Sequence, residues 1–398
     1  MKMKKVLLLT AFSAVFFYGS YSPSAEAYST WTEMAGQYEN PGYEADGKAS
    51  LSPEILSQWW KVFHDDTLNE LIDTALDHNR DLEAARARLG EARASLGISK
   101  ASKVPWLNAG AGWVRAKASD EVVSGVTPPA LKKTGLSIDR GEDMSYAGLD
   151  ASWEMDVFGK TRAKVKSSEY SLEAQRAMLY AAWVSLSSEV AMNYVTLRTL
   201  QEELAVTEAS IANQKENLHL LQINETSGLL PALSSDQAEY NLHAAEAEIP
   251  ELKTAISDTV NRISLLTGTV PGSLNEKLLS PAPLPDVDGE LYNVIPAETL
   301  RQRPDIHAAE MAWAAQTEKT KAAKAELKPR FSILGVLGLA ALGGGLFSAG
   351  SHAFGIMPQV TYPFFNRGAL KNRVYVERGK EKERKAEYEN TVLKAAGE

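Results

Sequence analysis

The sequence predicts a mainly α-helical protein with four β-strands of the kind that crosses a membrane, built from one helix-and-strand unit that occurs twice. Three observations lead to this prediction. Apolar residues recur at steps of three, four and seven through residues 160–267, which is typical of long packed helices. Four stretches alternate apolar residues with polar or small ones, which is typical of strands. The spacing of these elements is the same in both halves of the chain.

The composition restricts the classes of protein to which the chain can belong. Of its 398 residues, 44% are hydrophobic and 23% are charged, as in ordered proteins. The formal net charge of −9 disfavours nucleic acid as a partner, because phosphate binding requires a basic surface. The chain has no cysteine, which excludes disulfides, thiolate metal sites and the acylated N-terminal cysteine of bacterial lipoproteins.

Residues 1–27 have the features of a secretory signal peptide. Basic residues are followed by an apolar run over 6–18, and Ala25-Glu26-Ala27 fits an A-x-A cleavage site. The alternative is an uncleaved membrane anchor, for which the run is shorter than the ~20 residues that a helix needs to span a bilayer. We therefore predict export and cleavage after Ala27, with an irregular N-terminal segment over residues 28–51.

The first unit, predicted over residues 52–270, starts with a helix and two strands. The helix begins near Ser52, which can cap it, and extends to about Ser102. Alternation then predicts strands at about 107–115 and 146–157, separated by a polar segment.

A long helical hairpin over 160–267 completes this unit. Its first helix, from Lys160 to about Asn224, would be roughly 100 Å long at 1.5 Å per residue. Gly228-Leu229-Leu230-Pro231 predicts a reversal, and Pro250 predicts a kink in the second helix. Residues 271–296 are predicted to form a Pro-rich linker without secondary structure.

The second unit, predicted over residues 297–398, repeats the first. Arg303–Glu310 matches Asn79–Arg86 in pattern, and each stretch is followed at the same distance by a proline and an alternating stretch. Strands are thereby predicted at about 331–341 and 353–364, with the start of a helix after them.

This second unit is shorter than the first. Phe158 to Gly268 spans 110 residues, whereas 33 residues follow Phe365, so about 77 residues of a second helical hairpin have no counterpart. We therefore expect a chain that is truncated at its C-terminus relative to a full duplication. Gate residues from that hairpin cannot be located.

The strand candidates have a consequence for assembly. In lipid, strands are stable only in a closed barrel, because hydrocarbon cannot satisfy unpaired backbone groups. Four strands are too few, since the smallest such barrels have about eight, so the chain would close its barrel by oligomerisation. One alternative is a soluble sheet. Another is a transmembrane helix over the uncharged stretch 331–366, but the glycines of that stretch disfavour a helix.

Two groups of residues on these strands are candidates for contact with lipid and with a pore. Interfacial aromatic girdles are predicted from Trp113, Tyr146, Trp153, Phe354 and Tyr362. A lumen-facing row, with a mild cation preference, is predicted from Asp150, Glu154 and Asp156. The alternative for these carboxylates is a solvated polar face without a selective role.

No arrangement of residues in the sequence is typical of an enzyme. Phe158-Gly159-Lys160-Thr161 lacks the first glycine of a phosphate-binding loop, whose place is taken by Glu154. The six histidines are scattered without metal-ligand spacing. We therefore predict no catalytic residues, no cofactor and no metal site.

Three motifs give the chain a family resemblance. They are Trp59-Trp60-Lys61-Val62-Phe63-His64-Asp65-Asp66, Arg301-Gln302-Arg303-Pro304-Asp305-Ile306, and Phe158-Gly159-Lys160 with its partner Phe365-Asn366-Arg367-Gly368. Through them, residues 52–398 resemble the outer membrane factors, the TolC/OprM-like channels of tripartite export systems, and most closely their NodT branch. The resemblance implies a homotrimer, with three sets of four strands in a twelve-stranded outer-membrane β-barrel that continues into a periplasmic α-helical barrel.

The resemblance also implies a function, which is a passive conduit for the export of drugs or other small molecules. The implied partners are a periplasmic adaptor (membrane fusion) protein, an inner-membrane pump of the RND type and outer-membrane lipid. Relatives present a Gly-Leu turn to the adaptor, which makes Gly228, Leu229 and Leu230 a candidate docking tip. The alternative is a helix-ending glycine with leucines that cover the turn. The lack of a lipidated cysteine and the short second unit depart from the family pattern.

An interpretation from another class is a periplasmic adaptor or coiled-coil scaffold protein of an export system, which would also have a signal peptide and long helices. The two strand-loop-strand units discriminate between these interpretations, because an adaptor has one helical hairpin and no lipid-facing strands. Neither interpretation identifies the cargo or the partner pump.

Overall fold

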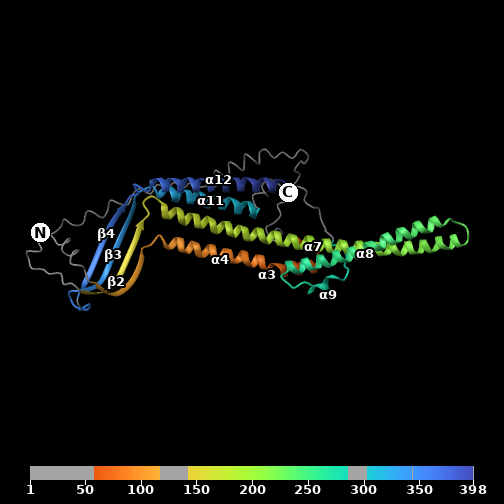
Figure 1. The fold of residues 1–398 in the computed structure, drawn as a ribbon, viewed down its shortest axis with the longest axis horizontal. Helices are drawn as coiled ribbons and strands as arrows, with labels where there is room; N and C mark the ends of the chain where they lie inside the picture. Colours follow the sequence, from red (N-terminus) through yellow and green to blue (C-terminus); the bar gives the residue numbers. More distant parts are fainter. Residues whose placement is uncertain (1–57, 117–141, 286–302, 343, 398) are drawn as a thin grey trace, which may run out of the picture. The chain divides into compact units, whose positions relative to one another are not determined.

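The computed structural model describes residues 58–116, 142–285, 303–342 and 344–397. The predicted signal peptide, the segment 28–51, the loop 117–141 between the first two strands and part of the Pro-rich linker lie outside these residues. The described elements are η1 Trp59–Phe63, α3 Asp66–His78, α4 Arg80–Ala101, β1 Trp106–Ala116, β2 Glu142–Met155, α7 Lys160–Thr226, α8 Ala232–Leu266, α9 Asn275–Leu278, α11 Pro304–Ala325, β3 Arg330–Leu342, β4 His352–Thr361 and α12 Arg367–Gly397. They make the chain mainly helical with four antiparallel strands (Figure 1), as the sequence predicts.

The helical stretch before the first strand is divided where two polar side chains cap helices. Asp65 caps α3, and Asn79 both ends α3 and caps α4. The Asn79 amide also donates to the Leu266 carbonyl at 2.9 Å. The prediction of one continuous helix over 52–102 is therefore wrong, because side-chain hydrogen bonds replace the backbone bonds of a continuous helix at these positions.

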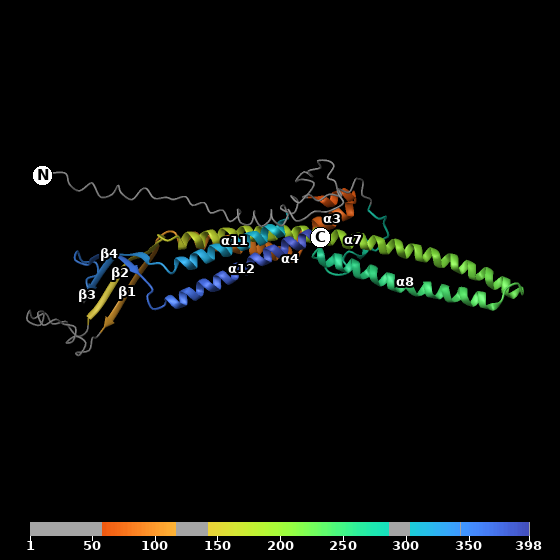
Figure 2. The ribbon, with the colours of Figure 1, turned by 90° about the horizontal axis from the view of Figure 1, so that it is seen from above.

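The predicted long hairpin consists of α7 and α8. α7 has 67 residues, about 100 Å at 1.5 Å per residue, and α8 has 35. α8 packs along the C-terminal part of α7, whereas α4 and α11 pack along its N-terminal part (Figures 1 and 2). Pro250 lies inside α8, and the Thr254 hydroxyl donates to the Pro250 carbonyl at 2.8 Å.

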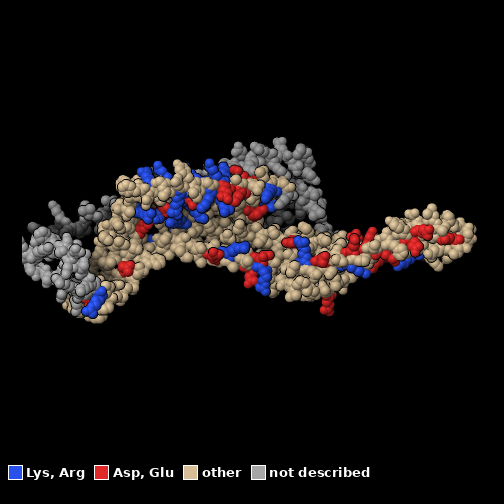
Figure 3. Space-filling model, viewed as in Figure 1, with Lys and Arg blue, Asp and Glu red and all other residues tan. Residues whose placement is uncertain are grey.

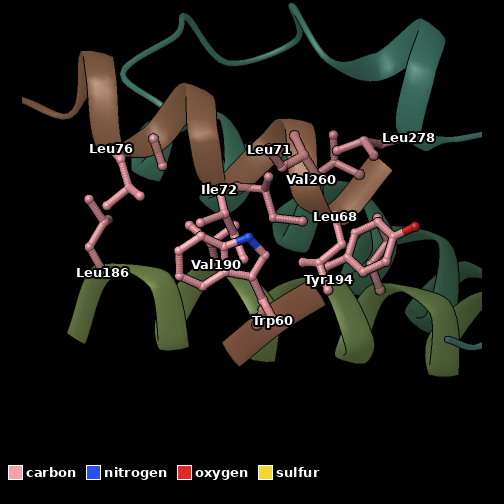
Figure 4. Packing of buried hydrophobic residues seen from close by; sticks show 14 of the residues in the cluster. Trp60, Leu68, Leu71, Ile72, Leu76, Leu186, Val190, Tyr194, Val260 and Leu278 are labelled. Carbon is pink, nitrogen blue, oxygen red and sulfur yellow. The ribbon is translucent and has the colours of Figure 1, made fainter. Parts of the chain in front are cut away.

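The main hydrophobic core lies where η1, α3, α7 and α8 meet (Figure 4). Ile72 of α3, Val190 of α7 and Val260 of α8 are fully buried in it. The Trp60 ring packs edge-on against Trp183 at a centroid distance of 5.7 Å. Val190 belongs to the seven-residue repeat of α7, so burial of that repeat holds the hairpin against the short helices that precede it.

The described part of the Pro-rich linker adds to this core. Residues 275–278 form the short helix α9, and the Leu278 side chain is fully buried. The Leu278 carbonyl accepts a hydrogen bond from the Gln201 amide of α7 at 2.7 Å. The prediction that this linker forms no element is wrong for these residues, because burial of the Leu278 side chain and the hydrogen bond to its carbonyl help to attach the segment to α7.

The elements after the linker repeat the order helix, strand, strand, helix. α11 lies between α7 and α12 (Figure 2). The Ser167 hydroxyl of α7 donates to the Ala315 carbonyl of α11 at 2.8 Å, and Trp313 stacks on Tyr388 of α12 at a centroid distance of 5.8 Å. Among the helices that the structure describes, none combines the length and the apolar character that a membrane span requires.

The four strands form one antiparallel sheet in the order β1-β2-β3-β4. They have 11, 14, 13 and 10 residues, and about 9–11 residues are enough for a tilted strand to cross a bilayer. The register is continuous through all three pairs. No described strand pairs with the outer side of β1 or β4, so both edges of the sheet present unpaired backbone groups.

Candidate functional site

One face of the sheet is strongly apolar. Residues paired across strands share a face, and successive residues of a strand alternate between faces. We name this surface the apolar face, and its large side chains are Leu107, Trp113, Leu149, Trp153, Phe331, Ile333, Leu337, Phe354, Ile356 and Val360. The Arg115–Asp143 ion pair, at 3.5 Å, lies at the end of this face that is farther from the helices.

The opposite face carries mostly small and polar residues, and we name it the polar face. Its small and polar members are Asn108, Gly110, Gly148, Asp150, Ser152, Glu154, Ser332, Gly338, Gly355 and Gln359. A sheet with one apolar and one polar face matches the division between lipid and lumen in membrane barrels.

Asp150 and Glu154 lie on the polar face, and each is paired. The Asn108 amide donates to the Asp150 carboxylate at 3.0 Å. The Lys160 ammonium donates to the Glu154 carboxylate at 2.5 Å. Within the described part of the chain, no group of three or more His, Asp or Glu side chains is arranged to hold a metal ion.

Asp156 lies beyond β2, which ends at Met155, and its side chain binds the first turn of α7, whose N-cap residue is Gly159. Its carboxylate accepts from the backbone N–H groups of Thr161 at 2.9 Å and Arg162 at 2.8 Å. The Arg162 guanidinium donates to the same carboxylate at 3.2 Å. The expectation that Asp156 belongs to the strand row is therefore wrong, because the unpaired N–H groups of the first helical turn bind its carboxylate.

Tyr146 lies on the polar face, apart from the other predicted aromatics. It is four residues from Asp150 on β2, so the alternation of the strand puts both side chains on one face. Its ring covers Gly112 of β1, where an added Cβ would lie 2.6 Å from ring atoms. Because the two side chains share a face, the girdle prediction for Tyr146 and the lumen prediction for Asp150 exclude each other.

The remaining predicted aromatics lie on or beside the apolar face. Trp113 and Phe354 are strongly exposed there. The Trp153 indole N–H donates to the Lys103 carbonyl at 3.1 Å. Tyr362 directly follows β4, and its ring packs edge-on against that of Phe364 at 4.7 Å. Their exposure with few packing partners is compatible with contact to lipid.

A row of glycines crosses the polar face and was not predicted from the sequence. Gly110 pairs with Gly148, which pairs with Gly338. A Cβ on Gly148 would lie 2.7 Å from the Leu337 carbonyl oxygen, and one on Gly338 would lie 2.5 Å from the Ala147 carbonyl oxygen. β2 and β3 therefore approach each other closely at this row. The signal was present as glycines inside strand patterns, but only the register aligns them.

The candidate tip is a helix-ending glycine followed by exposed leucines. Gly228 has a φ of +74°, and the Leu229 N–H donates to the Asn224 carbonyl at 2.9 Å, which closes the end of α7. Leu229 is 72% exposed, Leu230 36% and Leu233, which sequence reasoning missed, 73%. The alternative required leucines that cover the turn, but the exposed Leu229 does not cover it. An exposed apolar group of this kind is typical of a contact surface.

Comparison with known proteins agrees with this geometry. The profile of the outer membrane efflux protein family matches residues 71–269 and 295–398. The probable efflux pump outer membrane protein TtgC of Pseudomonas putida is 27% identical. The match covers 99% of this chain and 79% of the relative. The probable outer membrane lipoprotein SilC of Salmonella typhimurium is 26% identical, with 91% of this chain and 77% of the relative covered.

Solved structures give the same result. The outer-membrane channel OprN is 32% identical, with a TM-score of 0.78 over 90% of this chain and 80% of that one. The outer membrane protein VceC of Vibrio cholerae is 26% identical, with a TM-score of 0.76 over 85% of this chain and 78% of that one. These likenesses confirm the predicted fold class, in which long helices of a periplasmic helical barrel accompany four strands of an outer-membrane β-barrel.

Proposed function

Since the chain belongs to the outer membrane efflux protein family, we propose that three copies of it form one channel and that this channel connects through a periplasmic adaptor to an inner-membrane pump of the RND type. The chain is an outer-membrane channel subunit of an efflux pump and a passive conduit for drugs or other small molecules. Channels of this family transport solutes and work with the other components of a pump.

The unpaired edges of β1 and β4 support the proposal that the chain oligomerises, and the number of three copies follows from the family resemblance. An apolar face in lipid with two open edges leaves backbone N–H and C=O groups without partners, at a cost of several kcal/mol for each. Pairing β1 of one copy with β4 of the next removes both edges without adding strands from another protein. The adaptor or scaffold interpretation does not explain this sheet, because a solvated coiled coil needs no strands with a lipid-facing side.

The assembled state is tested by the migration of the outer-membrane fraction on a gel. We expect an oligomer that resists detergent at room temperature and converts to the 43.3 kDa precursor size, or slightly less after processing, on boiling. A chain that is recovered only as a monomer from the soluble periplasmic fraction would instead favour the adaptor or scaffold interpretation.

The proposed docking tip for the adaptor is formed by Gly228, Leu229 and Leu230. Leu229 is exposed at the reversal between α7 and α8, where the chain has no core to fill. We expect Leu229→Asp to abolish drug resistance in cells without lowering the amount of oligomer, because a carboxylate cannot be desolvated in an apolar contact. Leu265→Asp, at an equally exposed leucine of α8, is the matched control. Normal drug resistance with Leu229→Asp would contradict a role of this tip in adaptor docking.

The proposed lumen row is reduced to Asp150 and Glu154, and its role is a mild preference for cations. Both carboxylates lie on the polar face, where charge attracts counter-ions in a narrow passage. We expect the double variant Asp150→Asn with Glu154→Gln to lose cation preference in planar bilayers. An unchanged reversal potential would leave these residues as a solvated polar surface.

Residues 1–27 are proposed to direct export and to be cleaved after Ala27, without acylation of the mature chain. The proposal is supported by the basic start, the apolar run and the small residues at the cleavage site. Since the sequence has no cysteine, no thiol is present to receive an acyl chain. Intact-mass analysis of the protein from membranes is expected to give an unmodified N-terminus at Tyr28, and a lipid adduct or an uncleaved leader would contradict this.

A further inference from the structure

Four junctions between helix and strand lie where the ends of the strands meet the helices. We name this end of the sheet the helix-side edge, which is distinct from the unpaired edges along β1 and β4. The strands are antiparallel, so the starts of β1 and β3 and the ends of β2 and β4 are neighbours. The junctions connect α4 to β1, β2 to α7, α11 to β3 and β4 to α12. At this helix-side edge the mostly uncharged surface of the sheet gives way to the charged helices (Figure 3).

Cations without ion-pair partners gather at the helix-side edge. Lys103 follows α4, Lys328 precedes β3, and Arg367 and Lys371 lie in the first turns of α12, all of them exposed. Within the described residues, none of these four side chains has a carboxylate within ion-pair distance, whereas the carboxylates of Asp156 and Glu326 in the same junctions are paired. The edge therefore has a net positive charge that the chain itself does not neutralise.

Aromatic rings accompany these cations. Phe365 is fully exposed and Phe364 is 75% exposed, and both lie between β4 and α12. Phe158 lies against Phe331 at a centroid distance of 6.3 Å, which connects the β2–α7 junction to the start of β3. Nothing in the described chain covers Phe365, so its exposure to water would cost free energy in a soluble protein.

The other edge of the sheet lacks this combination. In its described part, Arg115 is paired with Asp143, and the residues that are described between Leu342 and His352 include no Lys or Arg. The difference between the edges is the difference expected between a surface that meets anionic phosphate groups and one that does not.

We infer that the helix-side edge binds anionic phospholipid headgroups of the periplasmic leaflet. Lys103, Lys328, Arg367 and Lys371 contact the phosphates, and the rings of Phe158, Phe364 and Phe365 insert at the level of the headgroups. Charge complementarity selects this partner, because exposed basic residues near an anionic membrane surface are attracted to its phosphate groups. The inference deepens the proposed function: it rests on the outer-membrane location and not on the number of copies in the channel.

The test compares the melting temperature of the purified full chain in nonionic detergent with added phosphatidylglycerol and with added phosphatidylcholine, followed by circular dichroism. We expect phosphatidylglycerol to raise the melting temperature by several degrees more than phosphatidylcholine does, and high salt to remove most of the difference. The variant Lys103→Gln, Lys328→Gln, Arg367→Gln, Lys371→Gln should lose the difference.

A control variant with the same change in net charge is Arg93→Gln, Lys319→Gln, Arg378→Gln, Lys382→Gln. These cations are exposed on α4, α11 and α12, away from the sheet, and the variant should keep the preference for phosphatidylglycerol. An equal response of the parent protein to both lipids, or a preference that survives in the edge variant, would overturn the inference. Gel migration, read separately on the same samples, reports oligomer formation, so failure of the trimer proposal would be recognised independently.

Discussion

At the scale of single residues, Arg198 of α7 connects three segments of the chain. It is 3% exposed, and its guanidinium donates to the Tyr194 hydroxyl at 3.2 Å, to the Gln201 side-chain oxygen at 2.8 Å and to the Ser280 carbonyl at 3.1 Å. The Tyr194 hydroxyl in turn donates to Asp65, the cap of α3, at 2.6 Å. Burial, followed by the hydrogen bond to Asp65, raises the pKa of Tyr194, so this ring remains a neutral donor at physiological pH.

The substitution Arg198→Met is expected to lower the free energy of unfolding by about 2–4 kcal/mol, because it leaves buried acceptors of Gln201 and Ser280 without a donor. Tyr194→Phe, which removes one hydroxyl, should cost about 1 kcal/mol. Denaturant titration followed by circular dichroism measures both. Equal stability of Arg198→Met and the parent would mean that the hydrogen bonds of Arg198 are not needed to attach the linker to α7.

Asp305 explains the Arg-Pro-Asp motif and makes a prediction about pH. Burial opposes ionisation of Asp305, but the hydrogen bonds and the charge of Arg303, which lies at 2.9 Å, together with the Ile306 N–H, lower its pKa on balance. The folded state thus favours the carboxylate. The stability that it contributes is present above the unfolded pKa of about 3.9 and is lost as the pH falls through the lowered value.

We therefore expect the parent protein to lose more stability than Asp305→Asn as the pH falls from about 5 to about 3. Denaturant titrations at several pH values measure this. Asp81 holds the matching place in the first turn of α4 but has no ion pair among the described residues, so Asp81→Asn is the matched control and should follow the parent. If the free energies of unfolding of the parent and of Asp305→Asn changed equally with pH, the Asp305 carboxylate would not contribute the expected stability.

At the scale of elements, the glycine row determines how closely β2 and β3 approach. The Cβ positions of Gly148 and Gly338 are occupied by backbone atoms of the opposite strand, and backbone cannot move aside as a flexible side chain does. Glycines inside strands are typical of positions where a curved sheet brings two backbones close together, as in a barrel.

Gly338→Ala is accordingly expected to reduce strongly the yield of the heat-modifiable oligomer, because the added methyl would lie 2.5 Å from the Ala147 carbonyl oxygen. Gly335→Ala on the same strand is the matched control, since its methyl would meet the Ala151 Cβ at an ordinary 3.7 Å. Gel densitometry of outer-membrane fractions measures both variants. Equal yields from the two would show that the strands can separate without loss of the fold.

The elements that could be predicted from the sequence are those whose signal is local. Period-two alternation located all four strands, and the seven-residue repeat located α7 and α8, because each pattern reflects one buried face. The misses depend on distant partners. Asn79 reads as a polar helix residue until its contact with Leu266 is known, and Leu278 reads as part of a loop until α7 is placed beside it.

The candidate site could be predicted in part for the same reason. Asp150, Glu154 and Trp153 were assigned to opposite faces by alternation, and the register agrees. Asp156 was misplaced because the end of β2 is set by the cap of α7, which alternation does not indicate. The same alternation places Tyr146 on the face of Asp150, so its position in the strand, and not its aromatic type, determines its face.

At the scale of the whole molecule, the chain combines charged helices with a sheet whose visible face is mostly uncharged (Figure 3). The sheet has an apolar face, a polar face and two unpaired edges. A single copy leaves these edges unsatisfied in lipid, and pairing between copies satisfies them. The central claim is therefore that β1 of one copy pairs with β4 of the next, in a ring of the three copies that the family resemblance implies.

Disulfide trapping tests this claim most directly, because the sequence has no cysteine to interfere. Ala109→Cys on β1 is combined in turn with a cysteine at Phe354, Ile356, Pro358 or Val360 on β4, all on the apolar face. Within one chain these positions are separated by β2 and β3, so at ~4.8 Å per strand they are too far apart to bond to each other. We predict that at least one pairing gives covalent dimers and trimers on oxidation, with no larger species. Monomers from all four pairings, or a ladder that extends beyond the trimer, would contradict the account.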